Sequence, residues 1–161
     1  MQVEGLLSAP SRADFAETLE RLLGAIEARG LTLFASIDHA AGAAAAGLAL
    51  RPTQLVIFGN ARGGTPLMQA QQLLGIDLPL RALVWQDAAL NTWISWSDVQ
   101  WLARRFSLPP TAAEAVTKLA AMLKGLVQEA AGAAAQEAEL DEELQDSFPA
   151  SDPLPWSHDT R

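Results

Sequence analysis

The strongest constraint on the fold is an apolar run, TQLVIFG, over residues 53–59, which stops at a Gly-Asn pair. Its β-branched and aromatic residues favour a strand. A Gly-Gly pair at 63–64 is then expected to allow a tight reversal of the chain. Thr65 is a natural cap for a helix over 65–75, with Pro66 at the first helical position, where its missing N–H costs nothing. This stretch therefore predicts a strand, a turn and a helix.

The same stretch spaces Gly59 and Gly64 like the two glycines of a phosphate-binding P-loop. A P-loop also needs a lysine that neutralises phosphate charge and a hydroxyl residue that holds magnesium. Here Thr65 stands in the place of the lysine, and Pro66 stands in the place of the hydroxyl. We interpret the stretch as a connection without a nucleotide. Weak anion binding at the helix start, helped by Arg62, stays open.

Elements of both kinds are predicted around this strand from the spacing of apolar residues. Before the central strand, we predict an edge strand over 3–8, a helix over 11–30 with Ser11 and Gly30 as its caps, a buried strand over 31–37 and a helix over 38–50 capped by Asp38. After the helix over 65–75, we predict strands over 78–86 and 91–96 joined as a hairpin. A helix over 97–106, capped by Ser97 or Asp98, follows them. The many small residues of 38–50 suggest close packing of that helix on a sheet.

Composition changes after Pro110, where the chain becomes rich in Ala, Glu and Leu. This part predicts a helical extension over 109–145, which docks on the preceding domain or on a second subunit. Its apolar stripe consists of Val116, Leu119, Leu123, Leu126 and Ala130. Residues 146–161 are rich in proline and small polar residues, and we expect them to be disordered. The predicted organisation is thus a domain over 1–108, the extension, and an acidic tail.

The net charge of −8 lies mostly in the second part, since residues 111–161 carry ten Asp and Glu against two Lys and one Arg. A chain without a basic stripe is a poor binder of phosphate backbones, so we expect no nucleic-acid partner. The absence of cysteine excludes disulfides, thiolate metal sites and a cysteine nucleophile. The sequence shows neither a secretory signal nor an apolar stretch long enough to span a bilayer, so a cytoplasmic location is expected.

His39 is one of two histidines and follows Asp38 at a predicted strand-to-helix junction. One interpretation makes His39 a general acid or base that Asp38 orients. The other makes it a helix-start residue hydrogen-bonded to backbone. No further ligands are spaced for a metal, so neither a metal nor another cofactor is expected.

Four tryptophans, at 85, 93, 96 and 101, gather in a short stretch. In a strand, Trp93 and Trp96 point to opposite faces, so one can be core while the other is surface or interface. Core packing with a subunit contact explains them better than a ligand-stacking site.

The order of several short motifs resembles a bacterial family, the domain of unknown function 302, over roughly residues 4–108. The motifs are Asp38-His39, Arg51-Pro52, Phe58-Gly59-Asn60, Gly64-Thr65-Pro66-Leu67-Met68 and Leu78-Pro79-Leu80. The resemblance implies an α+β fold with a curved antiparallel sheet covered by helices, similar to the TATA-binding-protein architecture, and a tendency to dimerise. It implies neither DNA binding nor an established activity. The end of the chain, DSFPASDP, resembles a short C-terminal motif of small bacterial proteins, also without a known role.

These observations predict a cytoplasmic, homodimeric, non-catalytic module that binds a small apolar or anionic ligand, or a protein partner, in a cleft between sheet and helices. His39, Asn60 and Thr65 are expected as polar groups near the cleft mouth, with Trp93 or Trp96 as its wall. Two alternatives stay open: a small enzyme that uses His39 as acid or base, and a structural protein that assembles through the helix at 111–130.

Overall fold

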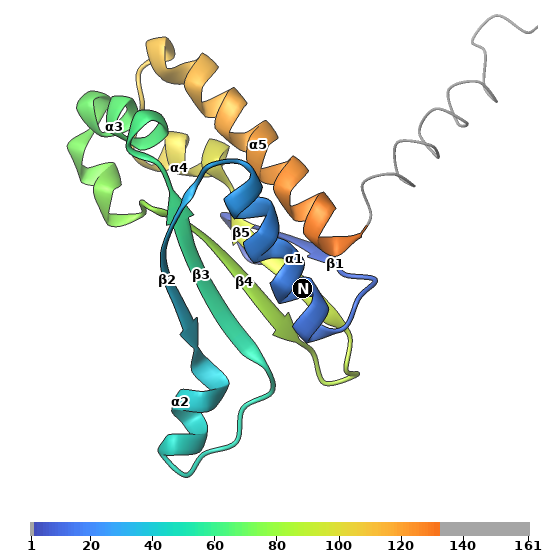
Figure 1. Ribbon diagram of the computed structural model, residues 1–161. Coiled ribbons are helices and arrows are strands. Elements are labelled where there is room, and N and C mark those ends of the chain that lie inside the picture. The colour runs from blue at the N-terminus through green and yellow to red at the C-terminus, as the bar shows by residue number, and fades with distance from the viewer. Residues whose placement is uncertain (1, 133–161) are drawn as a thin grey trace, which may run out of the picture.

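The computed structural model describes residues 2–132 (Figure 1). In chain order, its elements are β1 (Leu6–Pro10), α1 (Phe15–Ala28), β2 (Thr32–Asp38), α2 (His39–Ala45), β3 (Thr53–Gly59), α3 (Ala61–Ala70), the 3-10 helix η1 (Gln72–Ile76), β4 (Leu80–Gln86), β5 (Thr92–Ser97), α4 (Val99–Arg105), the 3-10 helix η2 (Pro110–Ala112) and α5 (Ala113–Ala131). The acidic stretch and the tail expected to be disordered lie outside the described residues.

The five strands form one antiparallel sheet in the order β1-β5-β4-β3-β2. The hairpin of β4 and β5 was predicted from its two apolar runs, and its register pairs Trp85 with Trp93. The strand over residues 53–59 was predicted without error in its bounds. The expected α+β class, with an antiparallel sheet covered by helices, is confirmed.

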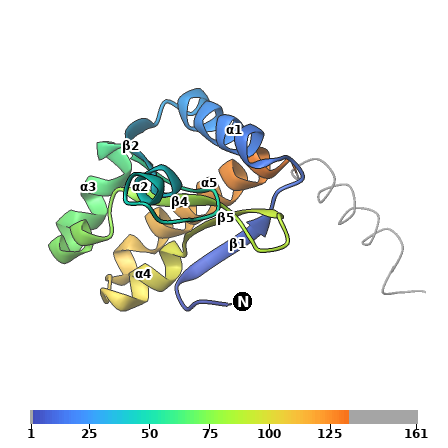
Figure 2. The same ribbon diagram turned by 90° about the horizontal axis from the view of Figure 1, so that it is seen from below.

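Helices α1 and α5 lie side by side against one face of the sheet (Figure 2). Alternate residues of the central strands are buried beneath them because successive side chains point to opposite faces. These buried strand residues are Val56, Phe58, Leu80, Ala82, Val84, Ile94 and Trp96. The helices complete the core with Leu22 and Ile26 of α1 and with Leu123 and Leu126 of α5.

The core therefore continues across residue 108, the predicted end of the first domain. Val116, Leu123, Leu126 and Ala130 of the predicted apolar stripe are all buried, and α5 packs on α1 within this chain. Among residues 2–132, no helix combines the length and the apolar character needed to cross a bilayer.

Strand β2 was expected to be buried, and this expectation is wrong. It lies at an open edge of the sheet and pairs only with β3. Leu33, Phe34 and Ile37 are exposed hydrophobic side chains on this edge. A continuous apolar run is typical of a buried strand, but the run itself does not say where in the sheet the strand lies.

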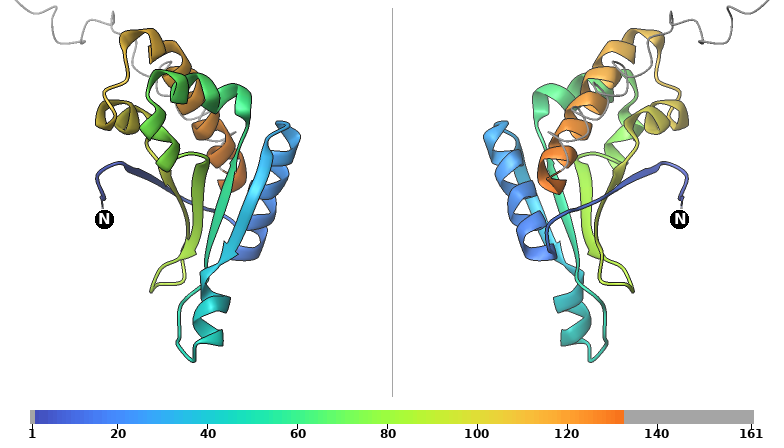
Figure 3. Two further views of the ribbon diagram at one scale, coloured as in Figure 1. Left: turned by 90° about the vertical axis from the view of Figure 1, so that its left-hand side faces the viewer. Right: turned by 90° about the vertical axis from the view of Figure 1, so that its right-hand side faces the viewer.

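Helix α2 was expected to pack closely on the sheet, and this expectation is also wrong. It extends beyond the end of β2 and the start of β3, away from the other helices (Figure 3). None of its residues is buried. Its small residues therefore form an exposed helix and do not mark a close contact with the sheet. The predicted cap is confirmed, because the Asp38 carboxylate accepts the Ala41 N–H at 2.9 Å.

The predicted caps of α1 need one correction. Asp14, rather than Ser11, is the N-cap, and its carboxylate accepts the Glu17 N–H at 2.8 Å. The Ser11 hydroxyl instead forms a hydrogen bond of 2.6 Å with the buried Thr18. At the other end, Arg29 is the C-cap residue, and Gly30 follows it with the left-handed φ of 67° that favours glycine there.

Candidate functional site: an apolar pocket between sheet and helices

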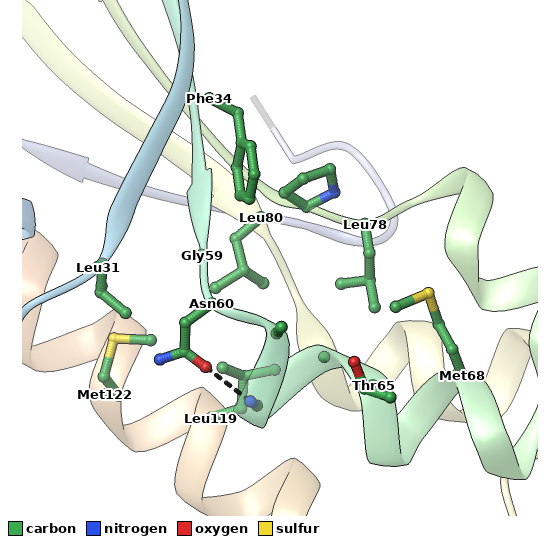
Figure 4. A pocket seen from close by; sticks show the side chains of 14 residues that line it. Leu31, Phe34, Gly59, Asn60, Thr65, Met68, Leu78, Leu80, Leu119 and Met122 are labelled. Atoms are coloured by element: carbon green, nitrogen blue, oxygen red, sulfur yellow. Dashed lines mark hydrogen bonds between the residues drawn. The ribbon is translucent and has the colours of Figure 1, made fainter.

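A pocket with a volume of about 280 Å³ opens where β2, β3 and the start of β4 meet α3 and α5 (Figure 4). Its lining is apolar on almost every side. The apolar side chains that line it are Leu31, Phe34, Ala61, Met68, Leu78, Pro79, Leu80, Leu119 and Met122. We call this hollow the apolar pocket.

The aromatic side of the apolar pocket is Phe34, which an irregularity in β2 places there. The register between β2 and β3 shifts between Leu33 and Ala35, so Phe34 has no partner opposite it. Such a bulge redirects one side chain out of the regular alternation. In Figure 4 the Phe34 ring points into the pocket above Leu80. The edge strand thereby contributes an aromatic side chain to the wall of the pocket.

The floor of the apolar pocket includes the start of α3, which differs from the predicted start. The helix begins at Ala61, and its N-cap is Asn60, whose Oδ1 accepts the Gly63 N–H at 2.6 Å. The predicted cap Thr65 therefore lies inside the helix, as does Pro66. The glycine pair forms part of the first turns rather than a reversal. The predicted helix over 65–75 is divided between the end of α3 and η1.

The polar side chains of the apolar pocket are few, and they belong to Asn60 and Thr65. The Asn60 carbonyl oxygen is occupied by its cap hydrogen bond, so its amide group is the part that can donate to a ligand. The Thr65 hydroxyl makes no hydrogen bond within the described part of the chain and can both donate and accept. The arrangement suits a molecule that is apolar over most of its surface and polar at one end.

A wider hollow lies on the face of the sheet opposite α1 and α5. We call it the tryptophan groove; its volume is about 820 Å³. Its lining residues are Gln2, Val3, Glu4, Leu6, Leu7, Ser8, Leu83, Trp85, Trp93 and Ser95. The rings of Trp85 and Trp93 stack with 6.2 Å between their centroids.

Asp87 in the β4–β5 turn has a pKa below the ordinary aspartate value. The Trp93 indole N–H donates to its carboxylate at 2.9 Å and is the largest cause of this lowering. The Asn91 and Ala89 backbone N–H groups donate to the same carboxylate and act in the same direction. Together these bonds fix the turn and orient one of the two groove tryptophans.

The structure brings together only two of the residues predicted for one site. Asn60 and Thr65 line the apolar pocket. Trp93 lies in the tryptophan groove, and Trp96 is buried beneath the helices, so the expected opposite orientation is correct but neither forms the wall of the apolar pocket. His39 is exposed at the start of α2, and the Asp38 carboxylate caps that helix.

Most of the lining was not identified from the sequence. It comes from segments far apart in the chain, around residues 31–34, 59–68, 78–80 and 119–122. No spacing rule connects them, because their proximity results from the order of strands and the packing of α5. Within the described residues, no group of three or more acidic, histidine or cysteine side chains is arranged to hold a metal ion.

Comparison with known proteins places these features in a family. Residues 7–126 match the model of "Domain of unknown function DUF302", which extends beyond the expected limit near residue 108 into α5. The crystal structure of an uncharacterized conserved DUF302 protein from Bacillus stearothermophilus superposes with a TM-score of 0.71 at 17% identity. That superposition covers 80% of this chain and 99% of the other, and it shows a shared fold.

Curated relatives are longer than this chain. It is 47% identical over 104 residues to proteins named fluoride-specific ion channel FluC 1 of Brucella suis biovar 1 and of Brucella abortus biovar 1. The matched residues are 65% of this chain, but only 41% and 38% of those two proteins. The chain thus spans about two fifths of the length of the curated relatives it matches.

Proposed function

The chain belongs to the DUF302 family, and on that premise we propose that it is a non-catalytic module that binds one small, largely apolar molecule in the apolar pocket. The observation that carries the proposal is the chemistry of the lining: nine apolar side chains, with polar side chains only at Asn60 and Thr65. Ligand sites are typically apolar hollows with a few polar groups that set orientation.

The size of the apolar pocket limits the ligand. A cavity of about 150 Å³ lined by aliphatic and aromatic side chains holds benzene. The apolar pocket, at about 280 Å³, has roughly twice that volume. It therefore suits a two-ring aromatic molecule or a short aliphatic chain with one hydroxyl or amide. Met68 and Met122 on opposite sides are flexible, so the pocket adapts its shape to several such molecules.

The proposal is tested by calorimetric titration of the full chain with 1-naphthol, which has two rings and one hydroxyl. We expect saturable binding that Leu119→Trp abolishes, because the larger side chain fills the apolar pocket. Leu73→Trp is the matched control, since Leu73 is 70% exposed and does not line the pocket. Equal binding by both variants, or no binding by the unchanged chain to 1-naphthol, 2-naphthol and 1-octanol, contradicts the proposal.

The module is further proposed to act as a homodimer, as the resemblance implies. The support is the open edge of β2, whose first six residues carry no charge and expose Leu33 and Ile37. Natural edge strands usually carry charges that prevent pairing, and β2 lacks them until Asp38. Two copies that pair along β2 would form one continuous sheet with a twofold axis.

Light scattering after size-exclusion chromatography tests the dimer. Ile37→Lys places a charge on the β2 edge and is expected to give a monomer. Leu6→Lys is the control on the opposite edge of the sheet, at β1, and should leave the dimer intact. A monomeric unchanged chain, or a dimer that only Leu6→Lys dissociates, contradicts pairing along β2. The cytoplasmic location stays a prediction of the sequence, and we assign the chain no channel activity.

A further inference from the structure

We propose that the tryptophan groove binds a segment of the same chain, the proline segment, which comprises residues 147–156 (SFPASDPLPW). The groove is separate from the apolar pocket, because it lies on the other face of the sheet. The inference therefore does not depend on the proposed function.

The tryptophan groove offers the aromatic surface of two indole rings whose N–H groups are already paired. Trp85 Nε1 donates to Ser95 Oγ at 2.9 Å, and Trp93 Nε1 donates to Asp87 at 2.9 Å. Ser95 Oγ also lies 2.7 Å from Ser8 Oγ. With both indole N–H groups satisfied, the two rings present apolar surface to an occupant rather than hydrogen-bonding groups.

The proline segment matches this chemistry. Pro149, Pro153 and Pro155 have no backbone N–H, so they bring no donor that would need an acceptor in the groove. Proline-rich segments are recognised by grooves lined with aromatic side chains, on which their rings pack. Phe148 and Trp156 add aromatic area at the two ends of the segment. Gln2 at the groove rim can donate to the carbonyl groups of such a peptide.

The point where the described chain ends makes this contact reachable. The Arg12 N–H donates to the Ala131 carbonyl at 3.0 Å, which holds the end of α5 beside the end of β1. Pro10, two residues earlier, pairs with Trp93 of the groove. Residues 133–146 separate this point from the proline segment, and a chain of that length reaches at most about 46 Å at roughly 3.3 Å per residue. The groove begins well within that distance.

Disulfide formation in the full chain tests the contact, since the natural sequence contains no cysteine. Leu6→Cys in the groove is combined with Ser151→Cys in the proline segment, and the pair is oxidised at low protein concentration. The control combines Leu33→Cys with Ser151→Cys. Leu6 and Leu33 are both 46% exposed leucines on edge strands, but they lie at opposite edges of the sheet. We expect the intramolecular disulfide of the Leu6→Cys pair to form at least tenfold faster.

A third variant adds Pro153→Ser, Pro155→Ser and Trp156→Ala to the Leu6→Cys pair and should slow its disulfide to the control rate. Equal rates for the two starting pairs overturn the proposal, as does a rate that the third variant leaves unchanged. Faster cross-linking of Leu6→Cys between two copies also overturns it, because the groove would then be an interface between subunits. If Leu6→Cys prevents folding, Val3→Cys, at a neighbouring exposed groove residue, repeats the test.

Discussion

The Trp93 indole N–H donates to the Asp87 carboxylate at 2.9 Å, and this bond joins the β4–β5 turn to the tryptophan groove. It is also the main reason that the pKa of Asp87 is lowered. A carboxyl group with a lowered folded-state pKa stabilises the fold above its unfolded pKa of about 3.9. This stabilisation is lost as the pH falls through the folded-state pKa.

Asp87→Asn is therefore expected to remove one acid-sensitive part of the stability. The unfolding free energy of the unchanged chain should exceed that of the variant at neutral pH, and the difference should shrink as the pH falls below about 4. Denaturant titrations at several pH values measure it. A difference that stays constant over this range would show that the Asp87 hydrogen bonds contribute nothing pH-dependent.

The N-cap of α3 gives a second prediction, which tests whether Asn60 or Thr65 caps this helix. Asn60→Ala should lower the unfolding free energy by about 1 kcal/mol, because the Gly63 N–H loses its acceptor. Thr65→Ala is the control, and we expect almost no loss, since Thr65 is exposed within the helix. The reverse order of the two losses in chemical denaturation would support the cap predicted from the sequence.

The choice between Asn60 and Thr65 as the cap shows that the sequence predicts a helix start in this region but not the residue at which the helix begins. The Thr-Pro pair has the pattern of a helix start, and so does Asn60 five residues earlier. Local preference alone does not choose between them. The structure begins the helix at the earlier residue and accepts Pro66 inside it, although Pro66 lacks the N–H that would bond to the Arg62 carbonyl.

Strands β2 to β5 were predicted within two residues of their observed ends, because apolar runs between turn residues need only local information. Strand β1, at Leu6–Pro10, overlaps only the second half of the strand predicted over 3–8. The edge position of β2 and the exposure of α2 were not predicted, because both depend on the order of strands in the sheet. The residues of the apolar pocket show the same difference between local and long-range information. Asn60 and Thr65 were identified from a local turn signal, whereas Phe34 and Met122 reach the apolar pocket only through the bulge and the packing of α5.

Two glycines with positive φ give a third prediction. Gly5→Ala and Gly47→Ala both force a side chain into left-handed backbone, with φ of 79° and 74°. At Gly47 the new Cβ meets nothing within 4 Å, so only the backbone cost of roughly 1 kcal/mol is expected. At Gly5 it would also lie 2.7 Å from the Trp101 ring, and the loss should be clearly larger. Equal losses in thermal or chemical unfolding would mean that the ring moves aside freely.

The place of α5 in the core gives the last prediction. Leu126 is fully buried and belongs to the same core as buried residues of α1 and of the strands. Leu126→Ala should therefore lower the unfolding free energy of the whole chain by about 2–5 kcal/mol, the usual loss for a buried leucine. Leu48→Ala, at a residue 67% exposed, is the control and should change it little. If 109–145 were a separate extension, Leu126→Ala would leave the main unfolding transition of residues 1–108 in place. A single transition that shifts as a whole would instead show that α5 and the sheet unfold together.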